Sequence, residues 1–260
     1  MSLDGHDKLC GYQKSMFPLC IYGGQDAFSS RVNFLRVWTT NNDPQVIGRF
    51  YFDYLYEHRV LPKIIRIDKG TETGVMATIH CFLHDRIGDL ENPVDSPSTQ
   101  NRIERWWREL HHRMEKFFKE QLRGLVENGD YDSSSITDRY MLSFVYIPVI
   151  QKELDIFRVS VWNTHQTRKQ KPKLLPTGIP EHIYSYPEQY AGEKYGLQIS
   201  EELLQEVAEL SGVLGSAEQF LDDAFRQECE RHIPNTDEIE AVEAANAYLY
   251  LKDNFNENSI

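Results

Sequence analysis

The sequence lacks the features of a secreted, membrane-embedded or zinc-binding protein. No apolar run approaches the length that spans a bilayer, and we expect no signal peptide because Met1-Ser2-Leu3 leads directly into charged residues. The four cysteines form neither a CxxC pair nor a Cys/His spacing typical of zinc sites, and they suggest no disulfide framework. We therefore expect a globular protein of a reducing compartment, the nucleus or the cytosol, with no membrane partner.

Positive charge is scarce in the last third of the chain. Residues 181–260 hold 4 Lys+Arg against 18 Asp+Glu, whereas residues 1–180 hold 24 against 22. The net charge of −12 therefore comes from the last third alone, and the first part remains able to carry a local basic face. The 260 residues allow one large domain, or one domain with a smaller companion.

The first half of the chain alternates between strand and helix patterns. A strand near the start is expected to be followed by two more. Residues 17–22 are apolar and β-prone, and Gly23-Gly24 is expected to end this strand, whereas residues 32–39 alternate apolar with polar side chains. Asp43 followed by Pro44 predicts a helix start, and the apolar spacing continues to about His58. A short apolar strand over 63–67 then ends at Asp68, and a second helix is expected over 74–85.

Helices dominate the rest of the sequence. A loop over 88–99, rich in Pro, Asp, Asn and Ser, precedes a long helix over about 99–127, and another helix is expected over 140–164. A basic connector covers 168–180. Acidic amphipathic helices follow near 200–211, 216–231 and 237–252.

Asp68 and Glu104 are the first candidates for a catalytic site. Asp68 ends a buried strand, Glu104 lies one turn into the long helix, and 35 residues separate them. In a chain with 40 acidic residues, this spacing alone is weak support. The context adds weight, because a strand end and a neighbouring helix start can bring two carboxylates within metal-bridging distance.

Two motifs around these carboxylates resemble a known family. Ile67-Asp68-Lys69-Gly70-Thr71-Glu72 resembles the second-carboxylate motif of integrase cores, and the segment 97–108 resembles their loop-then-helix Glu motif. The resemblance is to the retroviral-integrase/transposase superfamily, and it is closest to transposon-derived integrase cores of animal genomes. One departure is Gln100-Asn101, which stands where that group has Asn-Gln.

Further segments extend the resemblance over about residues 3–186. Residues 3–9 are similar to the family's first motif and offer Asp4 as the first carboxylate, with Asp7 and Asp26 as rival candidates. Residues 23–29 resemble its second strand and turn, and 162–165 and 176–180 resemble its closing helix and exit. Residues after about 195 resemble no family.

The resemblance implies a fold and a chemistry. The expected fold is α/β, a ribonuclease-H-like mixed sheet flanked by helices over 1–190, followed by an acidic helical extension over 191–260. The expected activity is cutting and joining of DNA by in-line displacement at phosphorus, with two Mg²⁺ or Mn²⁺ ions held by Asp4, Asp68 and Glu104.

Candidate DNA contacts follow from helical spacing and charge. Arg108 and His111 lie four and seven residues after Glu104, on the same helix face, and Arg105 flanks it. Lys69 stands beside Asp68. Trp106 and Trp107 are better explained as core or interface residues than as base-stacking groups. The densest basic run, which could follow a DNA backbone, is Arg168, Lys169, Lys171 and Lys173.

Two other interpretations stay open. The chain could be a non-catalytic DNA- or chromatin-binding protein that keeps the fold, or an interaction module whose acidic helices bind a protein partner or mask nucleic acid. Integrases normally assemble on DNA ends through an N-terminal DNA-reading module, and none stands before Asp4 here, which leaves open that the chain is a fragment. A homodimer or higher oligomer is expected from the resemblance alone.

Overall fold

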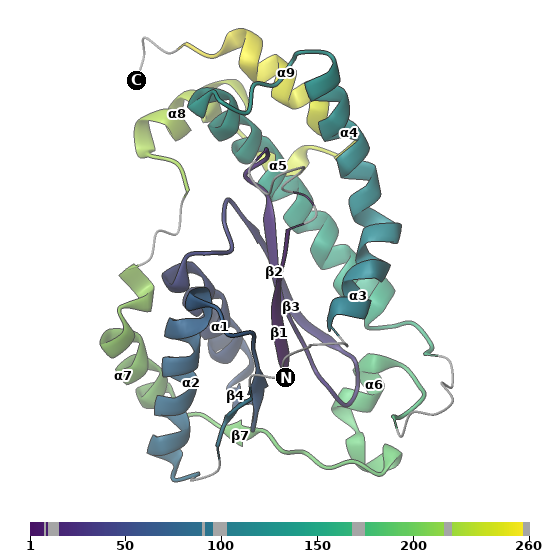
Figure 1. Ribbon diagram of the computed structural model, residues 1–260, viewed down its shortest axis with the longest axis vertical. Helices are drawn as coiled ribbons and strands as arrows, with labels where there is room; N and C mark the ends of the chain where they lie inside the picture. The colour runs from purple at the N-terminus through teal and green to yellow at the C-terminus, as the bar shows by residue number, and fades with distance from the viewer. Residues whose placement is uncertain are drawn as a thin grey trace.

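A mixed sheet forms the centre of the molecule. The computed structural model describes residues 1–7, 9, 16–89, 92–95, 103–167, 175–215 and 220–256. Within these residues, five strands pair in the order β3-β2-β1-β5-β6 (Figure 1). Their bounds are β1 (Ser2–His6), β2 (Cys20–Gln25), β3 (Val32–Trp38), β5 (Ile65–Arg66) and β6 (Val94–Asp95). The first three are antiparallel neighbours, whereas β5 runs parallel to β1 and β6 parallel to β5. The sheet confirms the expected ribonuclease-H-like α/β fold.

One face of the sheet is covered by three helices that pack on one another (Figure 1). These are α1 (Pro44–His58), α2 (Gly74–Ile87) and α7 (Glu201–Ser211). Their buried side chains form one apolar cluster with Leu3, Tyr22 and Phe34 of the strands. Burial of this cluster removes apolar surface from water and so stabilises this layer of the fold.

The other face of the sheet is covered by the helices that follow the loop expected over residues 88–99. These are α3 (Ile103–Leu110), a π-helical turn (His111–Glu115), α4 (Lys116–Glu127), α5 (Ile136–Ile156) and a second π-helical turn (Phe157–Trp162). Helices α8 (Asp223–His232) and α9 (Ala244–Asn254) pack on α5 and share its apolar cluster. The long helix expected over 99–127 is therefore present from Ile103, with a π turn inside it, and its first residues lie outside the described ones.

The predicted start of α1 is confirmed in detail. The Asp43 carboxylate accepts a hydrogen bond from the backbone N–H of Gln45, and Pro44 occupies the first helical position. Proline costs nothing there because its missing N–H would have no helical partner. The helix ends at His58 because Arg59 adopts a left-handed conformation with φ 55°.

The predicted end of the second strand at Gly23-Gly24 was wrong. Strand β2 runs through both glycines to Gln25, and Gly23 and Gly24 lie opposite Asp4 and Leu3 of β1. A Cβ on Gly23 would lie 2.7 Å from Leu35 Cδ2 and 3.1 Å from Trp107 Cη2. Glycine is therefore required here by close approach of side chains rather than by a turn.

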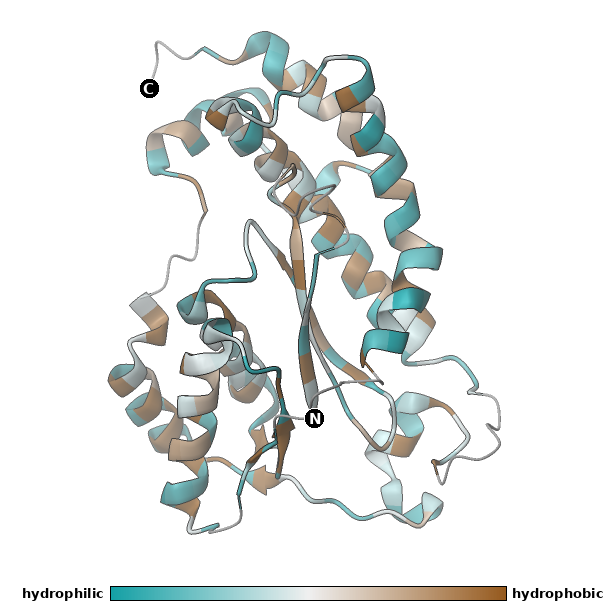
Figure 2. Ribbon diagram, in the orientation of Figure 1, coloured by the Kyte–Doolittle hydropathy of each residue, from teal (hydrophilic) through white to brown (hydrophobic). Residues whose placement is uncertain are grey.

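The segment after residue 180 pairs with the earlier strand β4 before the chain reaches the C-terminal helices. Helix α6 (Pro180–Ser185) and a 3-10 turn (Pro187–Tyr190) lead to β7 (Leu197–Gln198), which pairs antiparallel with β4 (Val60–Leu61). Figure 2 shows apolar residues along the strands and in bands along the helices, α7 to α9 included. In the described part of the chain, no helix combines the length and apolar character needed to cross a bilayer. The boundary between residues 190 and 191 stays a prediction.

Candidate active site

Asp4 lies in the middle of the central strand β1. Because successive side chains of a strand point to opposite faces, Asp4 and His6 share one face and Leu3 lies on the other. Asp4 stands opposite Gly23 of β2, whose missing side chain lets the Trp107 ring approach the strand closely. The Asp4 carboxyl is partly buried at this position.

Asp68 follows the neighbouring strand β5. Ser2 pairs with Arg66 in the parallel register, so continuing both strands by two residues brings Asp4 level with Asp68. The Ile67 N–H donates to the Asp95 carbonyl at 3.1 Å, which keeps the chain extended up to Asp68. Adjacent strands lie roughly 4.8 Å apart, so this register brings the two carboxylates close together.

Glu104 is supplied by α3, which packs against β1. Its side chain is exposed in the first turn of that helix. Three residues further on, the Trp107 indole Nε1 donates a hydrogen bond of 2.9 Å to Asp4 Oδ2. This bond directly joins the helix that carries Glu104 to the strand that carries Asp4.

The pKa of Asp4 is influenced by the other two candidate carboxylates, Asp68 and Glu104. The pKa of Asp4 is raised to about 6, first by burial and then by repulsion from Asp68, with a further contribution from Glu104. The hydrogen bonds from Trp107 and from the Gly5 backbone act in the opposite direction and lower this pKa. The charges of Asp68 and Glu104 thus act on Asp4. These three residues make up the carboxylate cluster.

The cluster offers carboxylate oxygens, which are the donors that Mg²⁺ and Mn²⁺ prefer. A cation near Asp4 would offset the effect that the charges of Asp68 and Glu104 have on this carboxyl. Among the described residues, no three His, Cys, Asp or Glu side chains converge closely enough to enclose a metal ion. The donor types and their electrostatic coupling fit a divalent cation, while the side chains do not form a closed cage.

The rival first carboxylates have structural roles elsewhere. Asp7 accepts a hydrogen bond from the Asn41 amide. Asp26 directly follows β2, and its Oδ2 accepts from the backbone N–H groups of Phe28 and Ser29 and from the Ser29 hydroxyl. Neither Asp7 nor Asp26 contributes to the pKa shift of Asp4. Asp4 is the rival whose pKa the charges of Asp68 and Glu104 raise, and its role as the first carboxylate stays a prediction.

The predicted DNA contacts are distributed unevenly around the cluster. Lys69, Arg105 and Arg108 are exposed near Asp68 and Glu104 in the chain. His111 instead turns partly inward, where its Nδ1 lies 3.2 Å from Glu115 Oε2. The predicted basic run Arg168, Lys169, Lys171 and Lys173 lies outside the described residues.

The sequence interpretation missed two features of the site. Trp107 is buried as expected, yet it also bonds to Asp4, and its position three residues after Glu104 was the available signal. His6 was not considered, although it lies on the same strand face as Asp4 and stacks on the Trp107 indole with ring centroids 4.6 Å apart.

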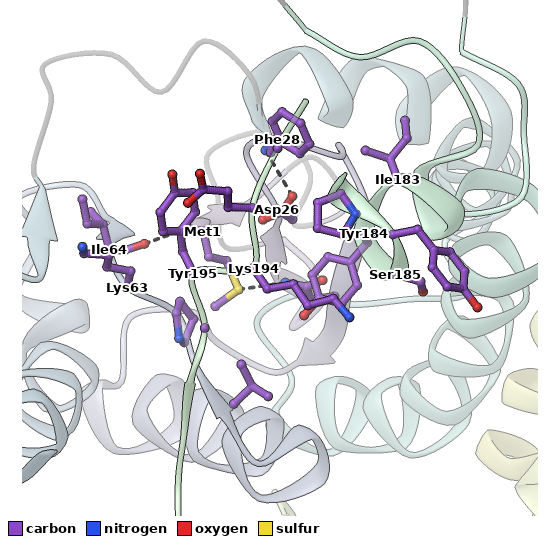
Figure 3. Close-up of a pocket in the computed structure, with 18 of the residues that line it drawn as sticks. Met1, Asp26, Phe28, Lys63, Ile64, Ile183, Tyr184, Ser185, Lys194 and Tyr195 are labelled. Atoms are coloured by element: carbon purple, nitrogen blue, oxygen red, sulfur yellow. Dashed lines mark hydrogen bonds between the residues drawn. The ribbon is translucent and has the colours of Figure 1, made fainter. Parts of the chain in front are cut away.

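The structure also contains an open pocket that does not include the three carboxylates. It encloses about 1140 Å³ between the 26–33 turn, the 60–64 segment and the 181–198 segment, with Asp26, Tyr184 and Tyr195 among its walls (Figure 3). None of Asp4, Asp68 and Glu104 lines it. The volume of this pocket therefore does not identify the catalytic site, and the carboxylate cluster remains the candidate site.

The fold and the site together define a ribonuclease-H-like core with acidic residues grouped at the centre of its sheet. The chain belongs to the integrase core domain family, whose family model matches residues 2–184. No curated protein and no solved structure matches the chain. The family is a polynucleotidyl transferase family that acts on DNA, and the match covers every element that carries the three carboxylates.

Proposed function

We propose that this chain is the catalytic core of a metal-dependent DNA integrase or transposase, which cuts a DNA strand and joins a DNA 3′ end to a new phosphate. Asp4, Asp68 and Glu104 are the residues that would hold the divalent cations, Mg²⁺ or Mn²⁺, two of which this chemistry uses. Membership of the integrase core family supports the reaction class. The assignment of the three residues rests on their places in β1, after β5 and in α3.

The observation that carries the proposal is the placement of the three carboxylates: β1 with Asp4 pairs with β5, which leads to Asp68, and α3 with Glu104 is joined to Asp4 by the Trp107 hydrogen bond. The pKa of Asp4 is raised to about 6 by burial and by Asp68 and Glu104, while Trp107 holds one oxygen at 2.9 Å. A carboxyl in this state gains more from a cation than an isolated surface carboxyl does, because the cation removes the repulsion that raises its pKa.

The carboxylates and the basic residues divide the work. Divalent cations held at the carboxylate cluster would supply positive charge for the attacking and leaving oxygens of an in-line displacement. Asp4, Asp68 and Glu104 fix where these charges lie, and no covalent bond forms between protein and DNA. Lys69, Arg105 and Arg108 are exposed and can bind DNA phosphates beside the cluster. Such a reaction takes place where the cell keeps its DNA, so we propose a nuclear location.

A strand-cutting and strand-transfer assay tests the proposal. Supercoiled plasmid and an oligonucleotide with a free 3′-hydroxyl are incubated with the chain in Mg²⁺ or Mn²⁺. We expect Asp68→Asn and Glu104→Gln each to lower the rate by about 100-fold or more, because loss of a metal ligand removes several kcal/mol of transition-state stabilisation.

The matched control is Glu109→Gln. Glu109 is exposed on the same helix as Glu104 and pairs with Arg113 at 3.3 Å, so its loss removes one acidic charge without touching the cluster. Its rate should equal that of the wild type. If the wild type and both ligand variants bind DNA equally and none cuts it, the chain is a non-catalytic DNA-binding protein and the proposal fails.

A further inference from the structure

Glu115 is a carboxylate at the core of the molecule that the proposed reaction leaves unexplained. It lies in the π-helical turn between α3 and α4 and has no exposed surface. Its Oε1 lies 2.8 Å from His6 Nε2, and its Oε2 lies 3.2 Å from His111 Nδ1. The first contact lacks the in-line geometry of a hydrogen bond.

Burial of such a group has a cost that apolar packing would avoid. A buried carboxylate without partners is unfavourable by several kcal/mol, and even a paired one often stabilises a fold no more than well-packed apolar residues do. The neighbouring helix positions Leu110, Met114 and Phe118 are apolar and buried. Stability alone therefore gives no reason for a carboxylate at position 115. The contacts of its partner His6 indicate another role.

His6 connects Glu115 to the candidate site. It is nearly buried, and its ring stacks on the Trp107 indole with an interplanar angle of 11°. It also lies two residues after Asp4 on the same face of β1. Trp107 in turn donates its N–H to Asp4 Oδ2. An unbroken series of contacts thus runs from Glu115 through His6 and Trp107 to Asp4.

These contacts restrain the indole from both sides. Gly23, opposite Asp4 in the sheet, allows the far edge of the ring to approach the strand, and His6 covers one ring face. With the ring plane fixed, its N–H points in one direction, and the Asp4 oxygen that accepts it cannot rotate freely. Hydrogen bonds from groups behind a metal ligand orient the ligand and raise metal affinity in the same way.

We propose that Glu115, His6 and Trp107 are positioning residues that hold Asp4 in the orientation for divalent-cation binding. This inference rests on the proposed function, because it assumes that Asp4 is a metal ligand. It adds to that function a buried Glu-His-Trp series that couples the helix carrying Glu104 to the strand carrying Asp4.

Calorimetric titration of the metal-free chain with Mg²⁺ alone tests the proposal without any activity measurement. We expect Trp107→Phe, which keeps an aromatic ring against His6 but removes the N–H, to weaken Mg²⁺ binding by about 10- to 100-fold. The matched control is Trp106→Phe. Trp106 is equally buried, and its Nε1 makes no hydrogen bond among the described residues, so its loss should leave Mg²⁺ affinity unchanged.

A second variant keeps the test decisive if Trp107→Phe does not fold. The double variant His6→Leu with Glu115→Met replaces the pair by apolar groups that have no aromatic ring to stack on the indole, and it should preserve or raise the melting temperature. We expect it to weaken Mg²⁺ binding several-fold, whereas a purely structural pair would show no such loss. Wild-type affinity in both Trp107→Phe and the double variant would overturn the positioning role. If the wild type and Asp68→Asn bind Mg²⁺ equally weakly, the metal site itself is wrong and the proposed function fails with it.

Discussion

Asp4 is the candidate metal ligand whose pKa is raised in the folded protein. Its pKa of about 6, against an ordinary value of 3.8, means that the folded protein disfavours the charged carboxylate. The contribution of Asp4 to the free energy of unfolding is therefore fully present below about pH 4, and it is lost as the pH rises through 6. In the absence of cations, the charged form costs up to about 3 kcal/mol at neutral pH.

Asp4→Asn should accordingly stabilise the metal-free protein. Asparagine keeps an oxygen that can accept the Trp107 N–H and removes the repulsion from Asp68 and Glu104. In EDTA at pH 7.5, we expect a higher melting temperature for Asp4→Asn than for the wild type, and near-identical values at pH 4. Scanning calorimetry from pH 4 to 8 measures the difference. A variant that is less stable at pH 7.5 would show that the folded protein does not disfavour the charged Asp4 carboxylate.

His80 gives the opposite pH dependence on the other side of the sheet. It is fully buried in α2, and its Nδ1 lies 2.6 Å from the Tyr51 hydroxyl. Burial, and then the neighbouring His84, lower the pKa of His80 to about 3. The folded state therefore favours the neutral ring. The stability linked to His80 is fully present above about pH 6.5 and is lost progressively as the pH falls to about 3.

His80→Gln should remove this acid sensitivity. Glutamine can still pair with Tyr51 but takes up no proton, so its free energy of unfolding should fall less steeply between pH 6.5 and 4. The wild type should lose at most about 1.4 kcal/mol per pH unit more than the variant. Urea unfolding at several pH values measures both slopes. Parallel slopes would mean that His80 does not remain neutral in the folded protein.

At the scale of elements, the contact between β2 and α3 depends on Gly23. A Cβ there would lie 2.7 Å from Leu35 Cδ2 and 3.2 Å from the Phe34 carbonyl oxygen, in addition to its approach to Trp107. Gly23→Ala should therefore destabilise the protein by about 1–3 kcal/mol through overpacking. The control is Gly124→Ala in α4, where a Cβ meets open space and should stabilise the helix by about 0.5–1 kcal/mol. Equal effects of the two substitutions in chemical denaturation would contradict this packing.

Local chemistry made some elements predictable and left others hidden. Asp43 and Pro44 fixed the start of α1 because a cap and a first-turn proline act within a few residues. The end of β2 was mispredicted because Gly23 and Gly24 have the composition of a turn, and only the neighbours Leu35 and Trp107 explain them. The π turn at His111–Glu115 stayed hidden since one extra residue barely alters a three-and-four spacing.

The same limit applies to the candidate site. Asp68 and Glu104 stand in recognisable local motifs, so their grouping with Asp4 could be expected. The bond from Trp107 and the burial of Glu115 depend on how α3 lies over β1, which no spacing along the chain specifies.

At the scale of the whole molecule, the acidic C-terminal helices are part of the fold. Ala244, Tyr248 and Leu251 of α9 are fully buried against α5, and α7 joins the opposite layer through Leu204 and Val207. Arg59 also pairs with Glu201 at 2.6 Å. Deletion of residues 195–260 would expose both cores, so it cannot test separately whether the acidic charge masks DNA.

Charge neutralisation on the surface tests masking without loss of the fold. Glu209, Glu230 and Asp253 are exposed, and their replacement by Gln, Gln and Asn removes three negative charges from the extension. If the extension repels DNA, affinity should rise by about two- to ten-fold at low salt and return to the wild-type value at high salt, where charges are screened. Fluorescence anisotropy with labelled duplex across a salt series gives the answer. Unchanged affinity at low salt would count against masking.

The central claim is that Asp4, Asp68 and Glu104 bind two divalent cations. Its most direct test is a crystal structure of the chain grown with Mn²⁺, with anomalous diffraction used to locate the metal. The account predicts two anomalous peaks about 3.5–4 Å apart, each in contact with carboxylate oxygens of these residues. Crystals that hold Mn²⁺ only at other positions, or bind none at saturating concentration, would contradict it.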